Sequence, residues 1–258
     1  MDTQQIKDLY LSGQSGVEIA KLTGYCPATI YKKLRQAGAE VRSNKVNNRR
    51  YFVNHEFFDE IDSAEKAYWL GFLYADGSIG KYNGQSTMKV DLSSVDKDHL
   101  ILLRNDLESN YPVRVFPQST TYGEVNVCRL QVTSDRIVNS LINHGCTERK
   151  TKDLSPPLFL EEIYNRHFIR GFVDGDGSIA KSPTSKTGYR LKIVRTKAML
   201  DWIKKNLPRA ASVTGPSRNV YSLEAQSDSV LWLYEDSTRS LKRKYERYLI
   251  IKDQSSNI

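Results

Sequence analysis

Apolar residues between positions 64 and 143 change from helical spacing to strict alternation and back. Residues 64–75 are apolar on most sides and predict a buried helix. After it, Met88, Val90 and Leu92 alternate with polar side chains, which is typical of a strand with one buried face. Further along, VDKDHLILLRNDL predicts a helix, VRVFP and EVNVCRLQV predict a second pair of strands, and DRIVNSLINHG predicts a closing helix.

The same order of elements returns in the second half of the chain. Strand YRLKIV, helix AMLDWIKKNL, strand NVYSLEAQ and helix SVLWLYEDS follow another apolar helix. Two matching phrases mark the repeat, GFLYADGSIGK at 71–81 and GFVDGDGSIAK at 171–181. A repeat of this size predicts two αββαββα modules that face each other across a pseudo-twofold axis, in an α+β fold.

Small residues lie four positions apart in the helix of each phrase. They are Gly71 and Ala75 in the first copy, and Gly171 and Gly175 in the second. Residues at this spacing share one helix face. Glycine within a helix costs about 1 kcal/mol relative to alanine, so its presence in both copies favours a packing reason. We therefore expect the two helices to pack against each other along these stripes.

An acid follows each of these helices, Asp76 in the first copy and Asp176 in the second. If the helices pack, both carboxylates emerge at the same end of the interface, where they repel unless a cation lies between them. Oxygen ligands of this kind suit Mg²⁺. A metal there would supply an activated water and a stabilised leaving oxygen to a phosphodiester. The alternative is that each Asp-Gly pair only ends a helix and opens a hairpin.

The overall charge favours a polyanionic partner. The 258 residues include 38 Lys and Arg against 30 Asp and Glu, a formal net charge of +8. The three cysteines, Cys26, Cys128 and Cys146, form no close pair, which predicts neither a zinc site nor a disulfide framework and suits a reducing cytoplasm. No apolar stretch approaches the ~18 residues of a membrane span, and the N-terminus does not resemble a secretion signal.

Residues 3–38 predict three short helices, with Pro27 in the first turn of the third and Gly38 after its end. The segment GQSGVEIAKLTGYCPATIYKKLRQAG resembles DNA-binding helix-turn-helix units. In such a unit the third helix would present the following side chains to DNA: Thr29, Tyr31, Lys32, Lys33 and Arg35. The alternative is a small helical bundle with solvated lysines.

The two repeated phrases resemble a known family as a pair. WLGFLYADG at 69–77 and IRGFVDGDG at 169–177 are similar to the two motifs that define the LAGLIDADG homing endonucleases. The resemblance covers residues 51 to about 252. It implies a monomer with a pseudo-dimeric saddle of two four-stranded antiparallel sheets and the motif helices at its centre.

The resemblance also implies a metal site and a substrate. The last acid of each motif, Asp76 and Asp176, would bind the catalytic ions, and Ala75 and Gly175 are also predicted to be metal-site residues. We expect two or more Mg²⁺ ions, with Mn²⁺ able to substitute, and double-stranded DNA with a long pseudo-symmetric target. Tyr74 departs from the motif's earlier acid, but that position is not a metal ligand in the family.

A basic pair follows the last helix of each half. Aligning CTERKTKDL with RSLKRKYERYL sets Arg149 and Lys150 against Arg243 and Lys244. Family members often place a lysine near each metal site from this region, so Lys150 and Lys244 are predicted to stabilise transition-state charge or to perturb the attacking water. The alternative is a basic helix end that is favoured by its dipole or that binds phosphates passively.

Outward positions of the strands predict a DNA-reading surface, because Arg, Lys and Gln read base edges in the major groove. The predicted reading residues are Lys89, Arg129, Gln131, Arg190, Lys192, Ser222, Glu224 and Gln226. Polar residues are also the default on the open face of a half-buried sheet. A polar linker adds four further basic side chains that could follow phosphates, Arg42, Lys45, Arg49 and Arg50.

The sequence therefore predicts a site-specific, metal-dependent DNA endonuclease that acts inside a phage-infected or bacterial cell. Its expected domains are a helix-turn-helix unit at 1–40, a basic linker at 41–58 and two motif modules at 59–157 and 158–258. A DNA-binding regulator on the same scaffold is the main alternative, although such proteins usually lose motif acids. An RNA maturase activity also stays open. An intein is disfavoured, because the chain lacks the terminal residues that splicing needs.

Overall fold

A computed structural model describes residues 1–12, 14–41, 51–121, 123–147, 154–183, 185, 188–217 and 220–256. The chain divides into two compact units, Met1–Phe52 and Val53–Ile258. Each unit has a core of its own, and the second contains both copies of the repeated phrase.

The first unit contains three helices at the predicted positions, α1 (Thr3–Leu11), α2 (Gly16–Thr23) and α3 (Pro27–Gln36). The side chains of Asp2 and Ser15 begin α1 and α2 with complete capping boxes. Pro27 occupies the first turn of α3, where a missing N–H costs nothing. The helices enclose a small apolar core of Ile6, Tyr10, Ile19, Ala20, Ile30, Leu34 and Ala39.

The first module of the second unit follows the predicted order of elements. Its elements are α5 (Ala64–Ala75), β1 (Gly77–Tyr82), β2 (Gln85–Ser93), the 3₁₀ turn η1 (Ser94–Asp96), α6 (Lys97–Asp106), β3 (Val113–Thr120), β4 (Gly123–Thr133) and α7 (Asp135–Asn143). The strands form one antiparallel sheet in the order β1-β2-β4-β3.

The second module repeats this arrangement, and the helix α12 follows it. Its elements are α9 (Glu162–Asp176), β5 (Ser178–Lys181), β6 (Tyr189–Arg195), α10 (Lys197–Asn206), β7 (Ser212–Ser217), β8 (Val220–Gln226), α11 (Ser227–Tyr234) and α12 (Lys242–Ser256). The sheet order, β5-β6-β8-β7, matches that of the first module. The α+β fold with two four-stranded antiparallel sheets is therefore as predicted, whereas α12 is an element that the repeat does not predict.

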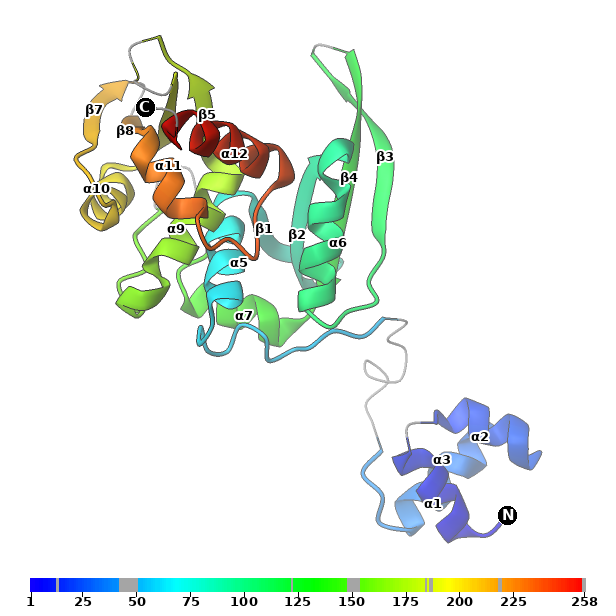
Figure 1. The fold of residues 1–258 in the computed structure, drawn as a ribbon. Coiled ribbons are helices and arrows are strands. Elements are labelled where there is room, and N and C mark those ends of the chain that lie inside the picture. The colour runs from blue at the N-terminus through cyan, green and yellow to red at the C-terminus, as the bar shows by residue number, and fades with distance from the viewer. Residues whose placement is uncertain are drawn as a thin grey trace. The chain divides into compact units, whose positions relative to one another are not determined.

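The alternation of side chains decides which face of each sheet is buried. Met88, Val90, Cys128, Leu130 and Val132 point inward and are fully buried, as the sequence predicted. The motif helices α5 and α9 lie between the two sheets (Figure 1). The apolar face of the first sheet packs mainly against α6 and α7, and that of the second sheet against α10 and α11, whereas the motif helices contact β1 and β6. The polar face of each sheet is left open.

Polar contacts join the two modules around the motif helices. The carboxylate of Asp106, at the end of α6, accepts two hydrogen bonds from the Arg239 guanidinium at 2.6 and 2.9 Å, and a third from Trp69 Nε1 at 2.6 Å. The Arg243 guanidinium contacts Asp96 at 3.2 Å. The segment between α11 and α12 is thereby fixed onto the first module.

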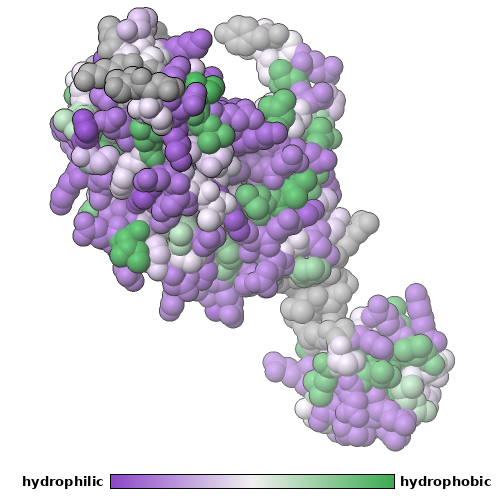
Figure 2. Space-filling model, in the orientation of Figure 1, coloured by the Kyte–Doolittle hydropathy of each residue, from purple (hydrophilic) through white to green (hydrophobic). Residues whose placement is uncertain are grey.

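The surface drawn in Figure 2 is mostly hydrophilic. Among the described helices, none is both long enough and apolar enough to cross a lipid bilayer.

Candidate metal and DNA site

The motif helices approach at their glycines, as the sequence predicted. A Cβ added to Gly71 would overlap the backbone carbonyl of Phe168, and one added to Gly171 would overlap the carbonyl of Tyr68. Gly175 lies against Ala75 in the same way. Any side chain at Gly71 or Gly171 would hold the two backbones apart, so the small-residue stripes set the distance between α5 and α9.

This packing brings the two motif acids to the same end of the interface. Asp76 caps the C-terminus of α5, and Asp176 is the last residue of α9. A Cβ on Gly175 would lie 3.3 Å from the Asp76 Cγ, so the two helix ends are in contact. Both carboxyl groups are half-buried. Helix C-termini also carry partial negative charge, which adds to the attraction for a cation at this point.

The donor groups at these helix ends fit a magnesium site that a nucleic acid completes. Within the described ranges, no three His, Cys, Asp or Glu side chains gather closely enough to enclose a metal. Mg²⁺ commonly uses one or two carboxylates and takes its other ligands from water and substrate phosphates. Asp76 and Asp176 supply such an incomplete set, next to the backbone of Ala75 and Gly175.

An arginine that the sequence analysis did not single out contacts the second motif acid. Arg195, the last residue of β6, forms an ion pair with Asp176 through Nη2, and its guanidinium lies 6.0 Å from the centre of the Phe172 ring. Both partners are mostly shielded, at 18% exposure for the arginine side chain and 21% for the aspartate. Superposing the two repeats along the strands would have revealed this residue, because Leu92 takes the equivalent place in the first module.

Lys244 lies beneath the second motif acid. Its side chain is only 3% exposed, and Nζ donates hydrogen bonds to the backbone carbonyls of Val173, Asp174 and Gly177 at 2.5, 2.7 and 2.7 Å. Two of these carbonyls flank Asp176. Lys244 therefore closes the end of α9, and its predicted action on the reacting phosphate stays a prediction. Its predicted counterpart Lys150, with Arg149, lies outside the described residues.

Burial lowers the pKa of the Lys244 ammonium to about 8, from a usual value of 10.5. As the pH falls, the unfolded chain takes up this proton near 10.5, whereas the folded protein does so near 8. The stability that comes from the neutral lysine is fully present above about pH 10.5 and is lost as the pH falls from about 10.5 to about 8.

We expect wild-type protein to gain about 2–3 kcal/mol of unfolding free energy relative to Lys244→Met between about pH 8 and about pH 10. Urea unfolding of both proteins at each pH measures the difference. A constant difference across this range would show that Lys244 titrates at its usual pKa.

A buried carboxylate, Asp174, links both motif helices to α12. It accepts hydrogen bonds from Tyr68 Oη at 2.7 Å, from Tyr234 Oη at 2.6 Å and from the backbone N–H of Leu241 at 2.8 Å. Burial raises the pKa of Asp174, while Lys244 and these donors act in the opposite direction. Because Leu241 directly precedes α12, the carboxylate holds the helix that carries Lys244.

Tyr74 takes the place of this acid in the first module and works differently. The Tyr74 hydroxyl donates to the backbone carbonyl of His144, just after α7. Burial raises the pKa of Tyr74, so the phenol stays protonated and keeps donating. The departure from the motif is thus a change of internal hydrogen bonding.

Three of the predicted reading residues lie on the polar face of the first sheet. Lys89 pairs in register with Gln131. The Arg129 guanidinium binds both carboxylate oxygens of Asp91, at 2.6 and 2.7 Å, and lies 4.8 Å from the Phe116 ring centre. This pair is bidentate and only 32% of each side chain is exposed, so it is held more firmly than an ordinary surface ion pair.

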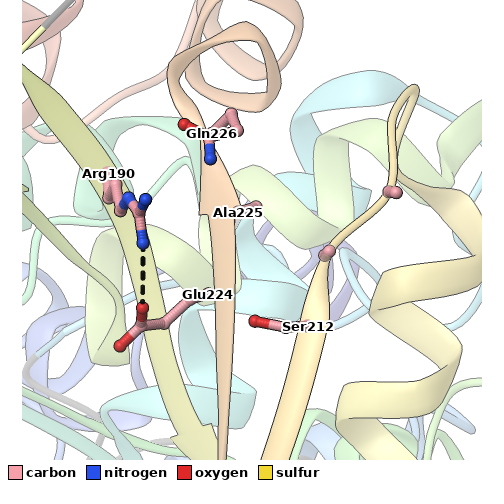
Figure 3. Close-up of a pocket in the computed structure, with 7 residues that line it drawn as sticks. Arg190, Ser212, Glu224, Ala225 and Gln226 are labelled. Atoms are coloured by element: carbon pink, nitrogen blue, oxygen red, sulfur yellow. Dashed lines mark ion pairs between the residues drawn. The ribbon is translucent and has the colours of Figure 1, made fainter. Parts of the chain in front are cut away.

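The other five predicted reading residues lie on the second sheet. Arg190 and Lys192 both approach the Glu224 carboxylate, at 3.5 and 3.4 Å. Figure 3 shows the Arg190–Glu224 pair beside Gln226, at a pocket of about 280 Å³ that lies on this face. Ser222 Oγ is buried and makes no hydrogen bond to any described residue. Predicted reading residues of both sheets are thus engaged in ion pairs, with Asp91 on the first sheet and with Glu224 on the second, a feature that alternation alone does not reveal.

The predicted DNA contacts of the first unit have unequal exposure. Lys32 and Arg35 are exposed on α3, whereas Thr29 and Lys33 are half-buried. The Tyr31 ring packs against Gly16 and the apolar core. The predicted linker contacts, Arg42, Lys45, Arg49 and Arg50, lie outside the described residues.

Sequence comparisons identify no relative of this chain. No family model matches it, and no curated protein matches its sequence. Solved structures do resemble it. The homing endonuclease I-WcaI bound to its DNA recognition sequence has a TM-score of 0.53 at 10% identity, over 83% of this chain and 96% of that one.

Two other similar structures differ in kind. The I-LtrWI LAGLIDADG homing endonuclease bound to target DNA has a TM-score of 0.46 at 15% identity, over 79% of this chain and 92% of that one. Full-length DUF199/WhiA from Thermatoga maritima has a TM-score of 0.47 at 17% identity, over 78% and 66%. The motif helices pack through their glycines and lie between two four-stranded sheets that have the same strand order. Together with these features, the similarity to I-WcaI shows that this chain has the LAGLIDADG homing endonuclease fold.

Proposed function

We propose that this protein is a site-specific, divalent-metal-dependent endonuclease that cuts both strands of a long DNA target. The observation that carries the proposal is the meeting of Asp76 and Asp176 at the ends of two abutting helices. Similar folds that are bound to DNA support the same partner.

In this proposal each aspartate serves one strand of the duplex. Asp76 and Asp176 would hold divalent cations, and the nearby helix ends keep both carboxylates in place. A bound Mg²⁺, or Mn²⁺ in its place, supplies Lewis-acid polarisation of the phosphodiester and lowers the pKa of a water. Lys244 fixes the backbone on either side of Asp176, so its first role is to position this acid.

The sheets would supply recognition. Lys89, Arg129 and Gln131 on one face, and Arg190 and Lys192 on the other, have the donors that read guanine and adenine edges. The first sheet would read one half of the target and the second sheet the other half, which gives a pseudo-symmetric site. One chain contains both acids and both sheets, so we propose a monomer.

Incubation with Mg²⁺ and the genomic DNA that flanks the protein's own gene tests the function. We expect discrete double-strand products, with Mn²⁺ able to replace Mg²⁺. A shifted but uncut fragment would instead favour a DNA-binding regulator on the same scaffold.

The first unit is proposed to extend the DNA contact on one flank. Lys32 and Arg35 project from α3, the position of a recognition helix in helix-turn-helix units. We expect removal of residues 1–50 to shorten the footprint on one side and to weaken binding at least about tenfold, because phosphate contacts are lost.

Footprinting and binding at several salt concentrations measure both effects of this truncation. Cleavage positions should stay the same at raised protein concentration, since the motif acids belong to the other compact unit. A footprint of unchanged length would assign residues 1–50 to folding or to a protein partner.

A further inference from the structure

The ion pair between Arg195 and Asp176 places a positive charge on a proposed metal ligand. A guanidinium and a divalent cation would compete for the same carboxylate oxygens. The pair is largely shielded from solvent, with 18% and 21% of the two side chains exposed, so solvent screens it less than an ordinary surface pair. A divalent cation that binds the Oδ2 atom of Asp176 would therefore have to displace the arginine.

The first module has no arginine at the equivalent position. Lys89 and Lys192 occupy matching places, because each pairs in register with the serine that follows its motif glycine. Three residues further along each strand are Leu92 and Arg195. An odd offset turns both side chains to the opposite face from the lysines, towards the motif helices. At this strand position the second module therefore has a charged side chain that contacts its motif acid, whereas the first module has a leucine.

The hydrogen bonding of Arg195 is incomplete. Its Nε is buried and makes no hydrogen bond to any described residue, although a guanidinium offers five N–H donors in a fixed fork. The two free oxygens of a phosphodiester match this fork of donors. The Asp176 carboxylate is a less suitable partner, because a metal would need the same oxygens. The chemistry of the arginine therefore points to a phosphate as its second partner.

We propose that Arg195 acts as an internal counter-ion, which keeps divalent cations from Asp176 until a DNA phosphate draws the guanidinium away. The inference rests on the proposed function and adds an order of events to it. Metal binding at Asp176 and DNA binding become coupled, and the coupling is reciprocal: DNA raises the metal affinity of this site and metal raises the affinity for DNA. Such coupling keeps the second site inactive on the free protein.

Manganese binding to the DNA-free protein tests this order directly, with Mn²⁺ counted by electron paramagnetic resonance. We expect Arg195→Leu, which copies the first module, to bind Mn²⁺ at least about fivefold more tightly than wild type at one site. Adding Asp176→Asn to this variant should remove the gain. The reciprocal change, Leu92→Arg, should weaken the Mn²⁺ binding that depends on Asp76.

Thermal unfolding of each variant checks that it folds, and Arg195→Gln replaces Arg195→Leu if the latter does not. If Asp76→Asn lowers Mn²⁺ binding but neither Arg195 variant raises it, the counter-ion role is overturned and the proposed metal site stands. A third outcome is that Asp76→Asn leaves Mn²⁺ binding unchanged and that Asp176→Asn leaves it unchanged in the Arg195→Leu variant. The metal assignment then fails, and the counter-ion role fails with it.

Discussion

Double-strand cleavage should be lost in both Asp76→Asn and Asp176→Asn, with rates at least about a hundredfold below wild type. Asparagine keeps the size of the side chain and its place at the helix end, but it removes the negative charge that holds a cation. Specific DNA binding should remain, because the sheet faces are untouched. Gel-resolved cleavage and binding on the same target, measured in parallel, separate the two effects.

A matched control for this prediction is Asp201→Asn. Asp201 is exposed on α10, where it pairs with Lys197 one helical turn earlier, so this change removes the same charge away from the motif helices. Cleavage by this variant should match wild type. Normal cutting by both motif variants would refute the assignment of the active site, whereas loss of DNA binding together with cleavage would show that the acids serve folding.

Replacing the motif glycines should cause the largest loss of stability. We expect Gly71→Ala and Gly171→Ala each to cost about 3 kcal/mol or more, because the new Cβ would overlap backbone carbonyl groups that cannot move aside as a side chain can. Against a typical unfolding free energy of roughly 5–15 kcal/mol, such a loss is large. Denaturant unfolding of each variant gives the value.

Gly84→Ala provides the comparison for these variants. Gly84 has φ +75 in the β1–β2 turn and nothing within 4 Å of an added Cβ, so this change carries only the backbone strain of about 1 kcal/mol. If Gly71→Ala cost no more than Gly84→Ala, the close approach of α5 and α9 would not be a source of stability.

The pattern of the chain was enough to predict the fold because local signals agreed with one another. Helical and alternating segments followed the same order twice, and the glycine stripes could be explained only by a helix pair. The inward strand residues Cys128, Leu130 and Val132 are buried as expected. The helix α12 was missed because the predicted repeat ended each half at the helix before the basic pair.

The chemistry around the motif acids was predicted less completely. Asp176 was predicted from its motif, but its partner Arg195 was not. Arg195 lies at the end of a strand, separated by one residue from the next helix, where a single arginine forms no recognisable pattern in the sequence. Asp174 was set aside as lacking a metal role, yet its carboxylate receives three hydrogen bonds from Tyr68, Tyr234 and the Leu241 backbone. Such contacts depend on tertiary packing, which alternation and spacing do not encode.

The contacts that cross between the modules limit how this protein can recombine. A hybrid that joined the first half of this chain to the second half of a relative would have to keep Tyr68 with Asp174, and Asp106 with Arg239, or leave buried polar groups unsatisfied. Exchange of one half alone would therefore need compensating changes at these contacts. New target preferences would arise more readily by residue changes on the open sheet faces than by exchange of whole halves.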